Sequence, residues 1–147
     1  MSKQAFSAVM HLLRAYSALE ERFSGALSVH GLSLKEVLLL MHLEREPSGR
    51  LTRVALAKRL NVSASTVTRM AQPLEKCCFV SRETDARDAR LAFVVLTDAG
   101  KEAVTNTRAT LQRLSSEVFR DRWTKEDISQ LAELLGRLTA GHPGDIS

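Results

Sequence analysis

The side chains that could do chemistry are concentrated between Ala64 and Cys77. Apolar residues recur there at helical spacing, which predicts a helix whose buried face is formed by Val67, Ala71, Leu74 and Cys78. The opposite face carries hydroxyl, amide and guanidinium groups and no carboxylate: Ser65, Thr66, Thr68, Arg69 and Gln72. Such groups can donate hydrogen bonds to base edges and to phosphate oxygens. This pattern is typical of a helix that enters the major groove of DNA.

Arg69 has the most specific chemistry of this set. Its guanidinium can make a bidentate contact with O6 and N7 of guanine, or it can bind a phosphate, and the sequence is consistent with both roles. The hydroxyls of Ser65, Thr66 and Thr68 suit base edges or phosphate oxygens, and an ordinary polar surface is the alternative for each.

The elements that position these side chains can be read from their neighbours. Thr52 to Leu60 has the pattern of a short helix, and Asn61 is suited to the left-handed conformation that ends one. Ser63 can cap the following helix by accepting a backbone N–H. Pro73 lies within that following helix and removes one backbone hydrogen bond, so we expect a kink there, with an early end of the helix as the alternative.

A β-hairpin is expected after the second helix. Residues 79–84 and 91–96 are short β-rich runs, and the second run is entirely apolar. The tip between them consists of two Asp-Ala-Arg triplets, residues 85–90, and contains neither Gly nor Pro. We therefore expect Asp–Arg pairing and local backbone hydrogen bonds to set its shape. A helix-turn-helix followed by a hairpin is a winged helix.

The order and spacing of these residues resemble the MarR family of bacterial transcriptional regulators. The segments that carry the resemblance are Asn61-Val62-Ser63-Ala64-Ser65-Thr66-Val67-Thr68-Arg69, the wing Asp85-x-Arg87-Asp88-x-Arg90, and Leu96-Thr97-Asp98-Ala99-Gly100. The resemblance implies that Arg87 reaches the minor groove. Arg90 lies closer to the strand, where a brace to Asp85 is the alternative to a DNA contact. The expected DNA-contacting residues are Ser63, Ser65, Thr66, Thr68, Arg69, Gln72, Arg87 and Arg90.

Helices are expected on both sides of this region. Residues 2–29 carry an apolar stripe from end to end, which a small domain cannot easily cover, so we expect packing on a partner subunit, on the C-terminal helices, or on both. Residues 33–36 have the spacing of a capping box that opens a second helix through Glu46. Leu51 and its neighbours could add a third strand to the sheet. Thr97 is expected to cap the helix after the wing, and residues 124–127 are expected to start the last helix.

These elements predict a mostly α fold with a small β-hairpin wing, in one MarR-type domain over residues 1–147. Residues 33–97 would form the DNA-binding lobe, and residues 1–32 and 98–142 the helical dimerisation lobe. Length and composition are those of one soluble globular domain, with 44% hydrophobic and 26% charged residues. No apolar run approaches the ~18 residues of a membrane span, so no membrane partner is expected.

Positive charge is concentrated on the winged-helix segment. The formal charge is +1 for residues 1–50, +4 for residues 51–90 and −1 for residues 91–147. A local excess of this kind is what contact with phosphates requires. The two adjacent cysteines, Cys77 and Cys78, do not form a disulfide framework, so a cytoplasmic location is expected. At least one of them is expected to be a buried apolar residue.

Catalysis has little support in the sequence. The seven glycines are scattered and form no phosphate-binding loop, and the four histidines show no metal-ligand spacing with one another or with the cysteines. We therefore expect no enzyme, no cofactor and no metal site. A peroxide sensor of the kind found in one branch of the family is not supported either, because no cysteine precedes Cys77.

The family resemblance also implies a small effector, often a phenolic or aromatic acid, between the dimerisation helices and the winged helix. The residues expected to line such a cleft are His11, Arg14, Tyr16, His30, His42 and Met70, each of which has a purely structural role as its alternative. The function expected overall is that of a homodimeric repressor, released by its effector from a pseudo-palindromic site on double-stranded DNA. The alternative is a winged-helix module for protein interaction or assembly, although such a face would be more apolar than this one.

Overall fold

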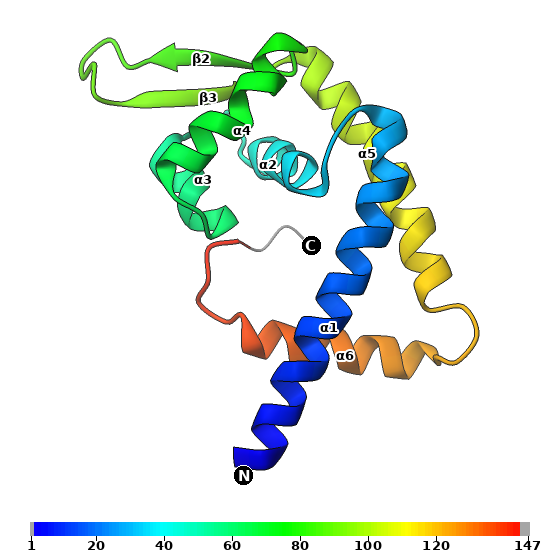
Figure 1. The fold of residues 1–147 in the computed structure, drawn as a ribbon. Coiled ribbons are helices and arrows are strands. Elements are labelled where there is room, and N and C mark those ends of the chain that lie inside the picture. The colour runs from blue at the N-terminus through cyan, green and yellow to red at the C-terminus, as the bar shows by residue number, and fades with distance from the viewer. Residues whose placement is uncertain (1, 145–147) are drawn as a thin grey trace.

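The computed structural model describes residues 2–144 and is mostly helical (Figure 1). The elements follow in the order α1 (Ser2–Leu27), the 3-10 turn η1 (Ser28–His30), α2 (Leu34–Arg45), β1 (Arg50–Thr52), α3 (Arg53–Leu60), α4 (Ala64–Lys76), β2 (Val80–Thr84), β3 (Ala92–Leu96), α5 (Asp98–Val118) and α6 (Lys125–Leu138). This order confirms the winged helix-turn-helix fold with helices on either side.

The helices begin where the sequence places capping residues. Ser33 and Glu36 form a complete capping box at the start of α2, and Thr124 and Asp127 form another at the start of α6. The side chain of Thr97 accepts a hydrogen bond from the backbone N–H of Gly100 in the first turn of α5. Each cap satisfies backbone N–H groups that would otherwise lack a partner, which fixes the residue at which the helix starts.

The wing belongs to a three-stranded antiparallel sheet of order β1-β3-β2. Leu51 pairs with Val94, and Val80 pairs with Leu96 at the other edge of the central strand. The third strand expected around Leu51 is thus confirmed. Because β3 lies between the other two strands, the hairpin is anchored to the segment that leads into α3.

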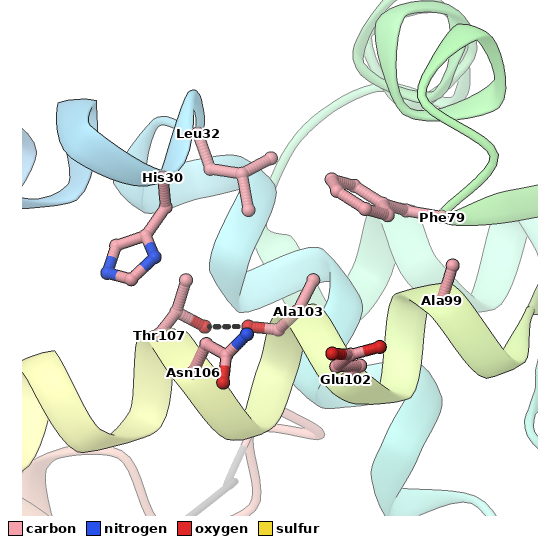
Figure 2. A pocket seen from close by; sticks show the side chains of 8 residues that line it. All are labelled: His30, Leu32, Phe79, Ala99, Glu102, Ala103, Asn106 and Thr107. Carbon is pink, nitrogen blue, oxygen red and sulfur yellow. Dashed lines mark hydrogen bonds between the residues drawn. The ribbon is translucent and has the colours of Figure 1, made fainter.

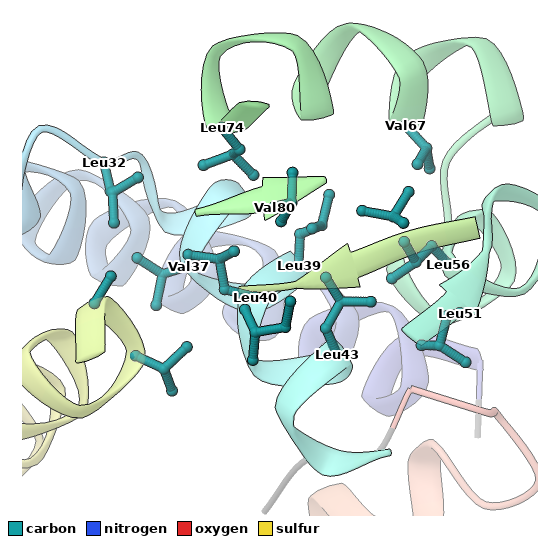
Figure 3. Close-up of a cluster of buried hydrophobic side chains, with 14 of the residues drawn as sticks. Leu32, Val37, Leu39, Leu40, Leu43, Leu51, Leu56, Val67, Leu74 and Val80 are labelled. Carbon is teal, nitrogen blue, oxygen red and sulfur yellow. The ribbon is translucent and has the colours of Figure 1, made fainter. Parts of the chain in front are cut away.

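The core is centred on α2. Leu39, Leu40 and Leu43 are completely buried, and the core is closed around them by side chains from α3, α4, the sheet and α5 (Figure 3). From the helix-turn-helix, Leu56, Val67 and Leu74 are completely buried in the same cluster. The DNA-binding helices expected from the sequence are therefore held by a continuous apolar core rather than by their own contacts.

The prediction for the cysteines was wrong. Cys77 and Cys78 are both exposed, because α4 ends at Lys76 and the chain then leaves the helical path. Cys78 has a left-handed backbone with φ +62°, which turns the chain toward β2 and carries the next buried position to Val80. The helix does continue past Pro73, so it does not end early, and the kink there stays a prediction.

The N- and C-terminal helices keep apolar side chains on their surface. Phe6 is 68% exposed and Leu138 is 66% exposed, and several other large apolar residues of α1 and α6 are exposed with them. Helix α6 contributes no buried residue. By length and composition, no single helix within residues 2–144 could cross a membrane, whereas the bent pair Ser2–His30 and Leu34–Arg45, at 75° to each other, passes that test together.

Candidate nucleic-acid interface

Asn61 sets the geometry of the turn between α3 and α4. Its backbone is left-handed, with φ 57° and ψ 47°, and its N–H donates to the carbonyls of Ala57 and Lys58. Val62 N–H also donates to the Ala57 carbonyl, over 3.0 Å. Ala57 itself is buried, which allows the two helices to approach closely. The turn thus fixes the angle at which α4 leaves the body of the protein.

The N-terminus of α4 is a cluster of hydroxyl groups. The Oγ of Ser63 accepts from the backbone N–H of Thr66 over 3.1 Å, which confirms the predicted cap. The same oxygen lies 3.0 Å from the hydroxyl of Ser65 and 2.9 Å from that of Thr66. A helix N-terminus carries a partial positive charge, and no acidic residue occupies the first turn. This end of α4 can therefore bind a phosphate or another acceptor.

Two arginines flank these hydroxyl groups. Arg69 is exposed, and its Nη2 donates to the hydroxyl of Thr66 over 3.2 Å. The hydroxyl of Thr68 donates to the carbonyl of Ala64 and accepts from Nη1 of Arg53 over 2.7 Å. Gln72 is exposed one turn further along the helix. All of the polar residues predicted for this face are thus brought together on one side of α4.

Arg53 is a member of this surface that the sequence analysis did not identify. It is the first residue of α3, and it reaches Thr68 on α4 across fifteen positions of sequence. The sequence did hold one indication of its role. A cation in the first turn of a helix is disfavoured by the helix dipole, so a contact elsewhere could account for an arginine at this position. Its partner could not be read from the sequence, since the contact depends on the crossing of the two helices.

The N-terminal half of α4 contains no carboxylate. The first acidic residue of the helix is Glu75, near its C-terminus, and Arg82 of β2 pairs with it at 3.0 Å. Repulsion between a carboxylate and a phosphate is therefore absent over residues 64–72. A surface with donors and cations but without acids can approach a polyanion.

The wing tip is held by its two aspartates. Oδ1 of Asp85 accepts from the backbone N–H groups of Arg87 and Asp88, over 2.7 and 3.2 Å. The carboxylate of Asp88 accepts from both the backbone and the side chain of Arg90, and these hydrogen bonds lower the pKa of Asp88. The predicted brace from Arg90 to Asp85 is thus wrong in its partner. Asp85 accepts hydrogen bonds from backbone N–H groups. The counter-ion of Arg90 is therefore Asp88, two residues away.

Arg87 differs from Arg90 in having no counter-ion. Within residues 2–144 its side chain makes no ion pair or hydrogen bond, although its backbone N–H is held by Asp85. The tip therefore presents one free guanidinium from a fixed backbone. Figure 1 places the wing and α4 at the same end of the molecule, away from the N-terminus of α1.

The six residues expected to line an effector cleft do not meet in a single site of the chain. His11 and Arg14 border a shallow hollow along α1 together with Phe6 and Met10, and Tyr16 is exposed on the same helix. Met70 is half-buried against the core. Only His30 lies at a hollow between the helical lobe and the winged helix.

That hollow has a volume of about 190 Å³ and lies between η1 and α5 (Figure 2). His30 and Leu32 border it at and just after η1, and Phe79 borders it from the winged helix. Helix α5 supplies the remaining lining residues: Ala99, Glu102, Ala103, Asn106 and Thr107. Nε2 of His30 lies 2.8 Å from the hydroxyl of Thr110, one turn further along α5. The lining combines an aromatic ring, aliphatic carbon, a carboxylate and an amide.

His42 lies inside the helix-turn-helix core rather than at a cleft. Only 3% of it is exposed, and its Nδ1 has no hydrogen-bond partner among residues 2–144. Burial lowers the pKa of His42, and the positive charges of Arg59, Arg45 and His142 lower it further. The ring is therefore neutral in the folded protein at neutral pH.

Within the described range 2–144, no group of three or more His, Cys, Asp or Glu side chains could hold a metal ion.

Comparison with known proteins agrees with this geometry. The sequence profile of the MarR family matches residues 30–91, from the end of η1 to the wing. The winged-helix segment of the chain is thus similar to the MarR family. The chain is 30% identical over 90 residues to the uncharacterized HTH-type transcriptional regulator YwaE of Bacillus subtilis (strain 168), a match that covers 61% of this chain and 52%, about half, of that protein.

Solved structures of MarR-family regulators extend the likeness to the helical lobe. Sco3205 of Streptomyces coelicolor, solved in complex with DNA, has a TM-score of 0.83 at 26% identity, over 96% of this chain and 89% of that one. The organohalide-sensing regulator RdhR-CbdbA1625, solved with 2,4-dichlorophenol bound, has a TM-score of 0.82 at 15% identity, over 95% of this chain and 82% of that one. At this lower identity the likeness concerns the fold.

Proposed function

We propose that the protein is a transcriptional regulator that binds double-stranded DNA as a homodimer and represses from a pseudo-palindromic operator. The observation that carries the proposal is the outer face of α4, where hydroxyls, Gln72, Arg53 and Arg69 gather without a carboxylate. The free guanidinium of Arg87 adds a second cationic point at the same end of the molecule. The DNA complex of Sco3205 shows that a protein of this fold binds DNA.

The two points have different roles in this proposal. The N-terminal half of α4 enters the major groove, where Arg69 reads a guanine or clamps a phosphate. Arg87 enters the adjacent minor groove from the wing, because narrow minor grooves attract arginine. Arg90, which is paired with Asp88, contributes less, since a DNA contact would have to compete with that ion pair.

A second copy of the chain completes the protein in this proposal. The apolar residues of α1 and α6 are exposed in the single chain, and the burial of such surface is the main force for association. Residues 1–32 and 98–142 would form the dimerisation lobe, and residues 33–97 the DNA-binding lobe. Two recognition helices would then meet two half-sites about one helical turn apart.

A small aromatic effector would bind in the hollow between η1 and α5 and change the spacing of the two lobes. A cavity of ~150 Å³ can hold a benzene ring, so about 190 Å³ suffices for one substituted ring. Glu102 lines the hollow, which disfavours a ligand carboxylate and favours a neutral phenol whose O–H can donate to it. The dichlorophenol complex of RdhR-CbdbA1625 supports this ligand class by analogy of fold.

The proposal is tested by selection of duplex DNA from a random library, followed by binding isotherms of the selected and scrambled sequences at several salt concentrations. A regulator gives an inverted repeat, a preference for it over scrambled DNA, and an affinity that falls steeply with salt. Failure to enrich any sequence, with weak and equal binding to all duplexes, would instead support the protein-interaction module. Addition of 2,4-dichlorophenol and of benzoate then tests the effector, because only the phenol should raise the melting temperature.

A further inference from the structure

The two cysteines of the chain lie side by side in the sequence at a corner that the proposed function does not use. Cys77 caps the C-terminus of α4, and Cys78 is the next residue on the way to β2. Both are exposed. They are therefore accessible to a reagent in solution, and no rearrangement of the core is needed to reach them.

The backbone at this corner is unusual. Cys78 has φ +62°, and within residues 2–144 the only other residue besides glycine with positive φ is Asn61. Asparagine adopts this conformation readily, whereas cysteine carries a β-carbon that is destabilised there. Glycine at position 78 would relieve the strain, so the cysteine is not there for the benefit of the turn.

The spacing of adjacent residues disfavours a disulfide but favours a shared ligand. Neighbouring Cα atoms are ~3.8 Å apart across a trans peptide, which is shorter than the ~4.4–6.8 Å that a disulfide spans. When one atom binds both sulfurs, the sulfurs need not approach to the length of a direct sulfur–sulfur bond, so the constraint that disfavours a disulfide is relaxed. Thiolate pairs select soft, thiophilic centres. We propose that Cys77 and Cys78 form a two-thiol site for trivalent organoarsenic compounds, which close a ring through both sulfurs.

Hydrogen bonds and close packing hold the corner to α4 and α5, so a ring formed there affects both helices. The N–H of Cys78 donates to the carbonyl of Glu75 in α4 over 3.0 Å. Its own carbonyl accepts from the hydroxyl of Thr97, the cap of α5, over 2.5 Å. The next carbonyl, that of Phe79, is packed so closely on Gly100 of α5 that a β-carbon on the glycine would lie 2.1 Å from it.

Closure of the ring therefore strains the joint between α4, the wing and α5. The backbone at Phe79 cannot shift toward α5, and that at Cys78 is held from both sides. We infer that occupation of the site lowers the affinity for DNA, a step that rests on the function proposed above. Formation of the site does not rest on it.

The reaction needs no oxidant. Phenylarsine oxide carries one oxygen on arsenic. The two thiols add to arsenic as their protons leave with that oxygen as one molecule of water, and two arsenic–sulfur bonds form. Arsenic stays trivalent and the sulfurs are not oxidised.

Intact-mass spectrometry of the protein with phenylarsine oxide tests the site directly. The expected result is one phenylarsenic group per chain with the loss of two hydrogens. The adduct should survive an excess of glutathione, a monothiol, and be removed by 2,3-dimercaptopropanol, a dithiol. Cys77→Ser and Cys78→Ser should each lose the glutathione-resistant adduct. An unmodified wild-type protein, or an adduct equally resistant in either single variant, would overturn the proposal.

The effect of the adduct on the rest of the protein is measured first as a change in melting temperature and then as a change in operator binding. The adduct should change the melting temperature of the wild type, whereas the same reagent should leave that of the Cys77→Ser, Cys78→Ser double variant unchanged. The adduct should also weaken operator binding, reversibly with the dithiol. A stable adduct that moves neither quantity would overturn the coupling. Absence of operator binding before any reagent is added would count against the proposed function and not against the thiol site.

Discussion

The winged helix and the two helical arms, α1 and α6, differ in whether they bury their apolar side chains within the chain. In the winged helix, Leu39, Leu56 and Val67 are completely buried, and several of the polar groups outside them are hydrogen-bonded to one another. In the arms, Phe6 and Leu138 are mostly exposed, and α6 buries nothing within the chain. The winged helix buries its apolar side chains within a single copy of the chain, while the helical arms expose an apolar surface of the kind that interfaces bury.

The two regions therefore expose surfaces that suit different kinds of partner. The winged helix exposes donors and cations that match a polyanion, and it needs a rigid core to keep them in register. The arms expose aliphatic and aromatic surface that matches another apolar surface. If this comparison is right, substitutions in the two regions must fail in different ways.

The largest expected effect concerns the arms. Leu135→Glu places a charge on α6 that is tolerated in the single chain, where Leu135 is exposed, but that would be buried and unpaired in the dimer. An unpaired buried charge costs about 3–5 kcal/mol, so the dimer should dissociate while the far-ultraviolet circular dichroism is retained. Sedimentation equilibrium measures this, with Gln130→Glu on the same helix as the matched control. A dimer of unchanged stability would remove this part of α6 from the interface.

Truncation of a side chain in the core of the winged helix should destabilise the folded chain rather than dissociate the dimer. Leu39→Ala removes a completely buried side chain of α2, and such changes destabilise by about 2–5 kcal/mol. The exposed Leu12 of α1, truncated in the same way, should cost far less in the isolated fold. Urea unfolding at a fixed protein concentration compares the two. Equal losses in the free energy of unfolding would mean that Leu12 of α1 contributes as much to the stability of the fold as the buried Leu39.

A smaller effect is expected at α4. Arg69→Ala should lower the affinity for the selected operator by about 1–3 kcal/mol and reduce discrimination against scrambled DNA if Arg69 contacts a base. Its side chain is exposed, so the melting temperature should stay at the wild-type value. Lys58→Ala, a cation in the last turn of α3, provides a control that removes a charge from the neighbouring helix. If both variants bind equally, Arg69 acts through its charge alone.

The buried histidine predicts a pH dependence of stability. Burial lowers the pKa of His42 in the folded protein, so the unfolded chain takes up a proton first as the pH falls. Stability should be complete above the ordinary histidine pKa of 6.5 and should decrease as the pH falls from there toward the lowered pKa. The pH dependence of urea unfolding should flatten in His42→Leu but persist in His142→Ala. An unchanged slope in His42→Leu would assign the effect to another group.

Local signals made much of the fold predictable. Ser33, Ser63, Thr97 and Thr124 each mark a helix start by a mechanism that acts within a few residues, and the structure confirms all four. The short β-rich runs at residues 79–84 and 91–96 likewise predict both wing strands. The position of Cys78 was mispredicted because helical periodicity was continued beyond the end of α4, where a left-handed residue redirects the chain.

Contacts between elements were harder to predict. The polar face of α4 followed from one periodicity, yet the contribution of Arg53 depends on the angle between two helices. The same holds for the pairing of Arg90, because the two aspartates of the wing compete for the same partners and only the path of the turn decides between them. His42 seemed a polar candidate for a cleft, but its neighbours Leu39 and Leu43 on α2 carry it into the core.

The donor-rich end of the winged helix is, in the function proposed here, a DNA interface. The salt dependence of binding by Arg87→Ala tests it most directly, because this side chain has no partner within residues 2–144 and its removal disturbs no contact. Loss of one phosphate contact per subunit should lower the slope of log K against log salt by roughly one or two ions per dimer, on selected and scrambled DNA alike. Arg90→Ala, whose partner is Asp88, serves as the wing control and should change the slope less. An Arg87→Ala variant that binds like the wild type at every salt concentration would contradict the account.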